Sequence, residues 1–133
     1  HPKEFQALLK NCGIGEYSIE EILIDRLSLV EKFCRKFPKK TLLLKGSNVV
    51  IGYYDGCKYK MFINPHGKPC LAKGGSGDVL SGIVAALLAQ GRRSIDAAIS
   101  GSLAHAFASQ KIKCDYSMTP QDLIGALSEL SDD

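Results

Sequence analysis

The sequence predicts an α/β fold, and three observations lead to this prediction. Residues 41–46, TLLLKG, form a short uninterrupted apolar run, which is typical of a buried parallel strand. Two strand-like stretches, NVVIGYY and YKMFINP, flank Asp55-Gly56, a pair that favours a tight hairpin. The rest of the chain has helical periodicity. Because one strand and a hairpin cannot cover that many apolar helix faces, we expect the C-terminal part of a three-layer α/β/α fold whose other strands lie elsewhere.

The elements are expected in the order helix, helix, strand, hairpin, and then three helices. Residues 19–37 predict a single amphipathic helix, which a capping box of Ser18 and Glu21 begins and Pro38 ends. The apolar face of this helix contains Ile19, Ile22, Leu23, Leu27, Val30, Phe33, Cys34 and Phe37.

The three C-terminal helices are each marked by a periodic apolar face. The first ends at Gly91 and its face contains Leu80, Ile83, Val84, Leu87 and Leu88. The face of the second contains Ile95, Ala98, Ile99, Leu103 and Phe107. The third begins with Thr119 as its N-cap and Pro120 at its first position, and it carries Leu123, Leu127 and Leu130.

Composition excludes several function classes. The chain has 133 residues, of which 45% are hydrophobic and 23% charged, as expected of one globular domain. A net charge of +3 and the lack of a basic stripe give no reason to expect nucleic acid as a partner. No apolar run reaches the ~20 residues that span a bilayer, so we expect no membrane partner. Five cysteines without C-x-x-C spacing and three scattered histidines predict no zinc or other metal site and no disulfide framework, and hence a cytoplasmic location.

A glycine-rich loop, LAKGGSGDVLSG at residues 71–82, opens directly onto a predicted helix. Gly74, Gly75 and Gly77 leave backbone N–H groups uncovered at a helix start, which is where proteins bind phosphate. The loop matches neither the Walker A sequence nor the dinucleotide fingerprint. Asp78 then has two interpretations. It is either an acid that the helix dipole favours, or a general base beside a bound phosphate chain, and local chemistry alone leaves both open.

A family resemblance bears on that choice. Residues 64–91, NPHGKPCLAKGGSGDVLSGIVAALLAQG, resemble the signature of the ADP/ATP-dependent NAD(P)H-hydrate dehydratases. These are repair enzymes of the ribokinase-like superfamily, often fused to an NAD(P)H-hydrate epimerase domain. HPKEF at 1–5, LLLKGSNVVI at 42–51 and SLAHAFAS at 102–109 are similar to three further family segments in the same order. Because the family's N-terminal strands have no counterpart, we expect residues 1–133 to be the C-terminal part of a dehydratase domain.

The resemblance implies a nucleotide-dependent lyase, which restores NADH or NADPH from the hydrated cofactor and releases phosphate with AMP or ADP. It implies that Asp78 is the catalytic base and touches the substrate, and that His1 also contacts the hydrated dinucleotide. It implies ADP or ATP as co-substrate together with Mg²⁺, for which no ligand can be named. The residues that it assigns to nucleotide binding are Lys45, Gly46, Ser47, Asn48, Val49, Gly75, Ser76 and Gly77.

Some positions depart from the family pattern, and others have simpler interpretations. Lys68 and Lys73 replace an asparagine and a small residue, and they either strengthen phosphate binding or point to solvent. Lys3 replaces a glycine, so the turn after His1-Pro2 is expected to differ. We expect His105, on an alanine-rich face, to be a packing histidine rather than a catalyst. A half-domain with uncovered helix faces is expected to form a homo-oligomer.

Two other functions stay open at this point. One is a small-molecule kinase of the same superfamily, which would leave the phosphate on its product. The other is a fragment that binds nucleotide or assembles with a partner but has no turnover.

Overall fold

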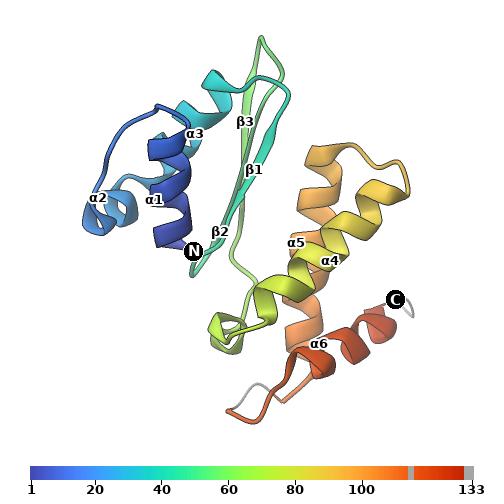
Figure 1. Cartoon of the computed structure of the whole chain (residues 1–133). Helices are drawn as coiled ribbons and strands as arrows, with labels where there is room; N and C mark the ends of the chain where they lie inside the picture. Colours follow the sequence, from blue (N-terminus) through green and yellow to red (C-terminus); the bar gives the residue numbers. More distant parts are fainter. Residues whose placement is uncertain (114–115, 131–133) are drawn as a thin grey trace. The chain divides into compact units, whose positions relative to one another are not determined.

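The computed structural model describes residues 1–113 and 116–130, and it divides into two compact units (Figure 1). The first unit contains His1–Gly46 and Val50–Ile63, and the second contains Ser47–Val49 and Asn64–Asp133. Helices together with an antiparallel sheet confirm the predicted α/β class. In the described part of the chain, no helix is long and apolar enough to cross a membrane.

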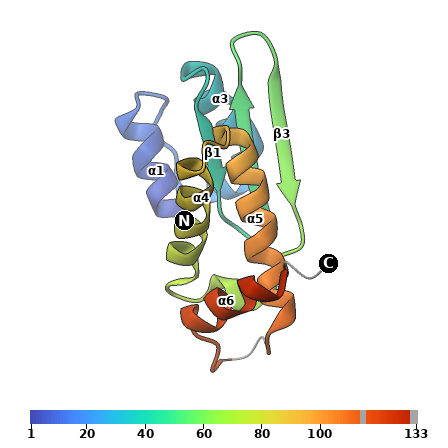
Figure 2. The ribbon, with the colours of Figure 1, turned by 90° about the vertical axis from the view of Figure 1, so that its right-hand side faces the viewer.

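The first unit packs three helices against a three-stranded sheet (Figures 1 and 2). Its elements are α1 (Pro2–Asn11), α2 (Ile19–Ile24), α3 (Arg26–Lys36), β1 (Thr41–Leu44), β2 (Val49–Tyr54) and β3 (Tyr59–Asn64), except that the end residues Val49 and Asn64 belong to the second unit. The core joins all three helices to the strands and contains Phe5, Leu9, Ile22, Leu29, Val30, Cys34, Leu44 and Val50.

The sheet corrects one prediction. The sequence pattern at 41–46 predicts a parallel, buried strand, but β1 pairs antiparallel with β2, with Leu42 opposite Gly52 and Leu44 opposite Val50. Four residues connect β1 to β2, and so short a connection can join only antiparallel strands. The predicted hairpin at Asp55-Gly56 is confirmed between β2 and β3. The Asp55 carboxylate accepts the Cys57 and Lys58 N–H groups there, at 2.7 Å each, and these bonds hold the pKa of Asp55 below its ordinary value.

The single helix predicted at 19–37 is two helices. The capping box of Ser18 and Glu21 is confirmed, but the chain leaves helical geometry at Asp25, where φ is −115° and ψ is 26°. The break turns α3 so that Leu29 is buried, whereas the predicted face residues Leu23 and Leu27 are 58% and 41% exposed. The apolar period therefore places Ile22, Val30 and Cys34 correctly in the core but wrongly assigns Leu23 and Leu27 to it.

The second unit is built from helices. Its elements are the short 3₁₀ helices η1 (Pro69–Ala72) and η2 (Ser128–Leu130) and the α-helices α4 (Ser76–Ala89), α5 (Ser94–Lys111) and α6 (Pro120–Leu127). In Figures 1 and 2, α4 and α5 run side by side, and α6 lies across the end of the pair where α4 begins. Val79, Ala108, Met118, Leu123 and Ala126 form the core. The predicted N-cap Thr119 and the glycine after α4, with φ of 81° at Gly91, are both confirmed.

The buried face of α5 differs from the predicted one. Its buried residues are mostly small, namely Ile95, Ala97, Ala98, Gly101, Ser102, His105, Ala106, Ala108 and Ser109. Phe107, which the periodicity places inside, is 38% exposed. Close packing of the two helices explains the small residues, because a Cβ at Gly101 would lie 2.7 Å from Val84 Cγ2 on α4.

We predict that two glycine-to-alanine changes have opposite effects on stability. Gly101→Ala should lower the free energy of unfolding by about 1–3 kcal/mol, because the added methyl group overpacks the contact with α4. Gly82→Ala should raise it by about 0.5–1 kcal/mol, because Gly82 lies within α4 with open space at its Cβ position. Urea unfolding of both variants is the measurement. Equal effects would contradict close α4–α5 packing.

The cysteines correct another prediction. Cys12, Cys34 and Cys57 carry free thiols, but Cys70 is disulfide-bonded, although the spacing of the cysteines gave no sign of a disulfide. Cys34 is fully buried under the sheet, and burial raises the pKa of its thiol to about 11. Cys114 lies outside the described residues.

Candidate functional site

The glycine loop ends in a left-handed turn at the start of α4. Gly75 is the N-cap of the helix with φ of 83°, and its carbonyl accepts the N–H groups of Asp78 at 3.1 Å and Val79 at 3.2 Å. The Ser76 N–H donates to the Lys73 carbonyl at 3.3 Å. In the part of the chain that the structure describes, the N–H groups of Gly75 and Gly77 have no acceptor. The helix start therefore keeps two donors for an anion, as the sequence predicts.

Asp78 lies beside these donors, in the first turn of α4, with its side chain exposed. It also lines a groove of about 490 Å³ between α4 and α6. Among the described residues that line this groove, Asp78 carries the only charge; the others are Gly75, Val79, Gly82, Ile83, Ala86, Pro120, Ile124 and Leu127. The structure thus places a carboxylate, at the edge of an apolar groove, next to two amides that have no acceptor in the described part of the chain.

Ser76 faces the other way. Its side chain is fully buried, and its hydroxyl lies 3.1 Å from Nε2 of His105, a buried residue of α5. The same Nε2 lies 2.9 Å from the Ser76 carbonyl oxygen. The hydroxyl of Ser76 is therefore turned away from any ligand at the helix start. A nucleotide contact by Ser76, which stays a prediction, would have to use its main chain.

The loop is also fixed from its other side. Asn64, at the end of β3, donates through Nδ2 to the carbonyl and hydroxyl oxygens of Ser102 on α5, at 3.0 and 2.8 Å, and accepts the His66 N–H at 3.0 Å. This buried amide anchors the segment that leads into η1 and the glycine loop. The sequence gave no indication of this contact.

The Lys73 ammonium group neither points freely to solvent nor faces the glycine donors. It donates to the carbonyl oxygens of Tyr116 at 2.6 Å and Met118 at 2.7 Å, just before α6. Asp122 completes a capping box with Thr119 there. The bonds from the Thr119 N–H and hydroxyl hold the pKa of Asp122 below its ordinary value, and the charge of Lys73 adds to this effect. Lys73 therefore links the loop to the start of α6.

We predict a structural effect for Lys73→Met. The change should lower the free energy of unfolding by about 1–3 kcal/mol, because two carbonyl groups lose a charged donor. Nucleotide affinity should change by less than about threefold. Lys68→Met is the matched control, since the Lys68 side chain makes no hydrogen bond or ion pair with the described residues, and it should have little effect on stability. Denaturant unfolding and titration calorimetry are the measurements. A tenfold loss of nucleotide affinity with an unchanged free energy of unfolding would show instead that Lys73 binds phosphate.

The remaining site residues that the sequence predicts lie in other segments. His1 caps α1, where its Nδ1 accepts the Lys3 N–H at 3.4 Å, so the segment that departs from the family pattern at Lys3 is helical. Lys45 and Gly46, in the first unit, follow β1 directly. Ser47 and Asn48 complete the connection, Val49 begins β2, and all three belong to the second unit. Gly75, Ser76, Gly77 and Asp78 are consecutive at the start of α4 and form one local site.

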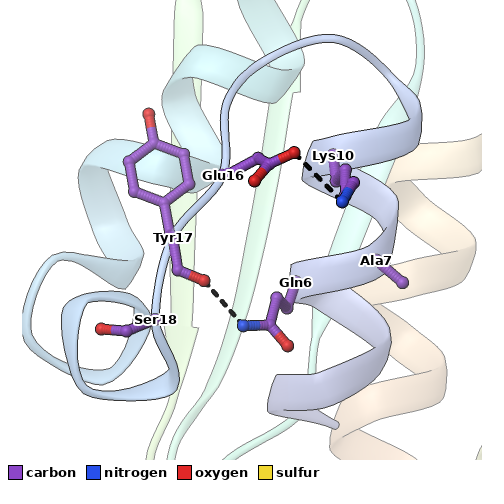
Figure 3. Close-up of a pocket in the computed structure, with 6 residues that line it drawn as sticks. All are labelled: Gln6, Ala7, Lys10, Glu16, Tyr17 and Ser18. Carbon is purple, nitrogen blue, oxygen red and sulfur yellow. Dashed lines mark hydrogen bonds and ion pairs between the residues drawn. The ribbon is translucent and has the colours of Figure 1, made fainter.

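A second cavity, of about 570 Å³, lies beside α1 in the first unit (Figure 3). It is lined by Gln6, Ala7, Lys10, Glu16, Tyr17 and Ser18. Figure 3 shows that its polar groups bond to each other: Lys10 pairs with Glu16 at 3.1 Å, and Gln6 donates to the Tyr17 carbonyl at 2.7 Å. None of the predicted site residues lines it, so this cavity is not the candidate site.

Comparison with known proteins identifies the family. The family described as NAD(P)H-hydrate dehydratase matches residues 1–129. The chain belongs to the NAD(P)H-hydrate dehydratase family. The glycine loop and Asp78 fall within the matched range, as do the segments around His1 and Lys45.

Relatives at the level of sequence carry matching names. The chain is 46% identical over 130 residues to the bifunctional NAD(P)H-hydrate repair enzyme Nnr of Helicobacter pylori. This match covers 98% of this chain and 27% of that protein. It is 34% identical over 113 residues to the ADP-dependent (S)-NAD(P)H-hydrate dehydratase of Neisseria meningitidis, and this match covers 85% of this chain and 35% of that protein. The chain therefore spans about a quarter to a third of the length of these dehydratase relatives.

Solved structures share the fold. The ADP/ATP-dependent NAD(P)H-hydrate dehydratase of Bacillus subtilis, co-crystallised with ATP/Mg²⁺ and soaked with CoA, matches with a TM-score of 0.80 at 23% identity. The match covers 98% of this chain and 46% of that one. The dehydratase fold predicted from the glycine-loop signature is thereby confirmed for this chain.

Proposed function

We propose that this chain is part of an enzyme that removes water from hydrated NADH or NADPH at the expense of ADP or ATP. The products are the restored cofactor, free phosphate, and AMP or ADP. The observation that carries the proposal is the start of α4, where the Gly75 and Gly77 amides have no acceptor among the described residues and lie beside the exposed Asp78 carboxylate. The family membership supplies the reaction.

The proposed chemistry has two steps. Asp78 first takes the proton from the hydroxyl group on the hydrated nicotinamide ring, and the resulting oxygen attacks the terminal phosphorus of the nucleotide. The bond from that phosphorus to the bridging oxygen breaks, so AMP leaves from ADP, or ADP from ATP. The ring nitrogen then expels the phosphorylated oxygen, and the C–O bond breaks to release phosphate. The resulting iminium ion loses a proton from the neighbouring ring carbon to give the reduced ring. Phosphorylation is needed because hydroxide is a poor leaving group.

The glycine amides stabilise the charge that moves through this reaction. Backbone donors that are already oriented toward the transferring phosphoryl group cost no reorganisation during the reaction. The Gly75 and Gly77 N–H groups are suited to this role because no protein acceptor competes for them in the described part of the chain. The α4 dipole adds to the effect, since its positive end lies at the same place.

The nucleotide and substrate contacts remain part of the proposal. We assign Lys45, Gly46, Ser47, Asn48 and Val49 to the nucleotide, and His1 to the hydrated dinucleotide. Mg²⁺ prefers one or two carboxylates together with substrate phosphates. The described residues contain no group of three His, Cys, Asp or Glu side chains that fits a metal ion, so the ion would enter with the nucleotide. Its chemistry would be to neutralise the phosphate charge.

The wider biology is proposed on the same basis. Residues 1–133 would form the C-terminal part of the dehydratase domain, and the bifunctional relatives suggest that an epimerase domain belongs to the same polypeptide. A cytoplasmic location and assembly into a homo-oligomer are further parts of the proposal. The substrates are small molecules, and we expect neither nucleic acid nor a membrane as partner.

Product analysis tests the proposal against its rivals. Hydrated NADH is incubated with ADP or ATP and Mg²⁺, using this chain and a version extended upstream to the relatives' length. The extended protein should regain the near-ultraviolet absorbance of NADH and release one phosphate per NADH. Phosphate retained on an alcohol would support a small-molecule kinase. If this chain binds nucleotide without turnover and the extended protein turns over, this chain is a binding fragment of a working enzyme.

A further inference from the structure

His105 is a buried histidine that the proposed reaction does not use. It lies on α5 with 4% of its surface exposed, and its Nε2 lies close to two atoms of a single residue, Ser76, at the start of α4. Both residues belong to the second unit. Packing alone does not require such a contact, because an apolar side chain would fill the same space.

The geometry assigns the proton on this nitrogen. A carbonyl oxygen can only accept a hydrogen bond, and the Ser76 carbonyl lies 2.9 Å from Nε2. Nε2 must therefore carry hydrogen, since an unprotonated nitrogen would place two lone pairs against each other. His105 donates to the Ser76 carbonyl, and the Ser76 hydroxyl at 3.1 Å lies within reach of the same N–H.

The Ser76 carbonyl belongs to the same rigid group as the Gly77 N–H. The peptide bond between the two residues is planar, and the structure has no cis peptide bonds among its described residues, so this C=O and N–H point in opposite directions. A donor that holds the carbonyl therefore sets the direction of the amide. The Gly77 N–H is one of the two amides at the helix start that have no acceptor among the described residues.

We propose that His105 is a positioning residue for the Gly77 N–H. By donating a hydrogen bond to the Ser76 carbonyl, on the opposite side of the same peptide group, it directs this N–H toward the transferred phosphoryl group. This inference rests on the proposed function for its catalytic consequence. His105 itself touches neither nucleotide nor substrate. The role suits a glycine-rich helix start, because the glycines on both sides of Ser76 make this first turn of α4 more flexible, and a donor on the Ser76 carbonyl adds to the hold of the helix.

The test compares three changes at His105 in the upstream-extended protein. Gln can place its Nε2 near the position of the histidine Nε2, Leu has no donor, and Asn is polar but too short. Leu and Asn should lower kcat by about ten- to a hundredfold, because removing an oxyanion donor outright costs roughly a hundred- to a thousandfold. The KM for nucleotide should change by less than about threefold, and Gln should recover most of the rate. The matched control is Ser109→Ala. Ser109 is another buried polar residue of α5, and its hydroxyl donates to the Ala106 carbonyl of the same helix at 2.6 Å.

A second readout does not depend on activity. In protein labelled with ¹⁵N-glycine, the Gly77 amide resonance should shift in the Leu and Asn variants, return toward wild type with Gln, and stay in place in Ser109→Ala. An unshifted Gly77 resonance, or a kcat loss no larger than that of Ser109→Ala, would overturn the inference. If the wild-type protein performs no dehydration, the proposed function fails, and the Gly77 resonance alone then decides whether His105 holds this peptide.

Discussion

Asp78→Asn should lower kcat by about a hundred- to ten-thousandfold and leave nucleotide binding nearly unchanged. Asparagine fills the same space in the first turn of α4, but its amide cannot take a proton from the ring hydroxyl. The glycine amides that we assign to the phosphate are untouched by the change. Steady-state rates in the upstream-extended protein and nucleotide titration by calorimetry measure the two effects separately.

Asp96→Asn is the matched control for this prediction. Asp96 is also an acid in the first turn of a helix, but its carboxylate pairs with the exposed Arg93 at 2.6 Å. Its loss should leave kcat within about twofold of wild type. If Asp78→Asn keeps more than a tenth of the wild-type rate, Asp78 is only a favourable charge at a helix N-terminus, and the general-base assignment is wrong.

Gly75→Ala should both destabilise the protein and abolish turnover. The φ of 83° at Gly75 disfavours any side chain, and the added Cβ would lie 2.5 Å from Pro120 Cγ in α6. Because the left-handed conformation costs an L-residue about 1–2 kcal/mol and overpacking about 1–3 kcal/mol, we expect a loss of roughly 2–5 kcal/mol. If the backbone of residue 75 instead leaves the left-handed conformation, the amides of residues 75 and 77 change direction and kcat falls.

The neighbouring glycine provides the control. Gly74 is exposed, and nothing lies within 4 Å of a Cβ built on it. Gly74→Ala should therefore change the free energy of unfolding by less than about 0.5 kcal/mol. Denaturant unfolding of both variants, with rates measured on the folded fraction, decides the outcome. Equal stabilities would mean that the turn does not depend on Gly75.

Local signals in the sequence predict local structure well. The capping boxes at Ser18 and Thr119, the hairpin at Asp55-Gly56 and the glycine after α4 are each set by neighbours a few residues away, and all lie where predicted. The start of α4 at the glycine loop is of the same kind. Its N–H donors depend on consecutive residues, so the local sequence predicts the phosphate-binding role proposed for Gly75 and Gly77. The role proposed for Asp78 needs the family resemblance, because local chemistry leaves two interpretations open.

Features that depend on tertiary packing are missed. Periodicity assigns the α5 face to its large side chains, but close approach of α4 selects small residues such as Gly101 instead. The break at Asp25 is also missed. The antiparallel pairing of β1 is missed although it follows from the short connection between β1 and β2. The alanine-rich face predicts a packing histidine at His105, and its contact with Ser76 cannot be anticipated because 29 residues separate the two. For Lys73 the sequence suggests only phosphate or solvent, whereas its partners are carbonyl groups 43 and 45 residues away.

An oxygen-label experiment tests the central claim most directly. Hydrated NADH carrying ¹⁸O in its ring hydroxyl is converted by the upstream-extended protein in unlabelled water with ADP and Mg²⁺, and the released phosphate is analysed by mass spectrometry. If the ring hydroxyl attacks phosphorus at the start of α4, that oxygen leaves with the phosphate, and each phosphate carries one ¹⁸O. Unlabelled phosphate, with the ¹⁸O found in water, would show that the hydroxyl is never phosphorylated and would contradict the account.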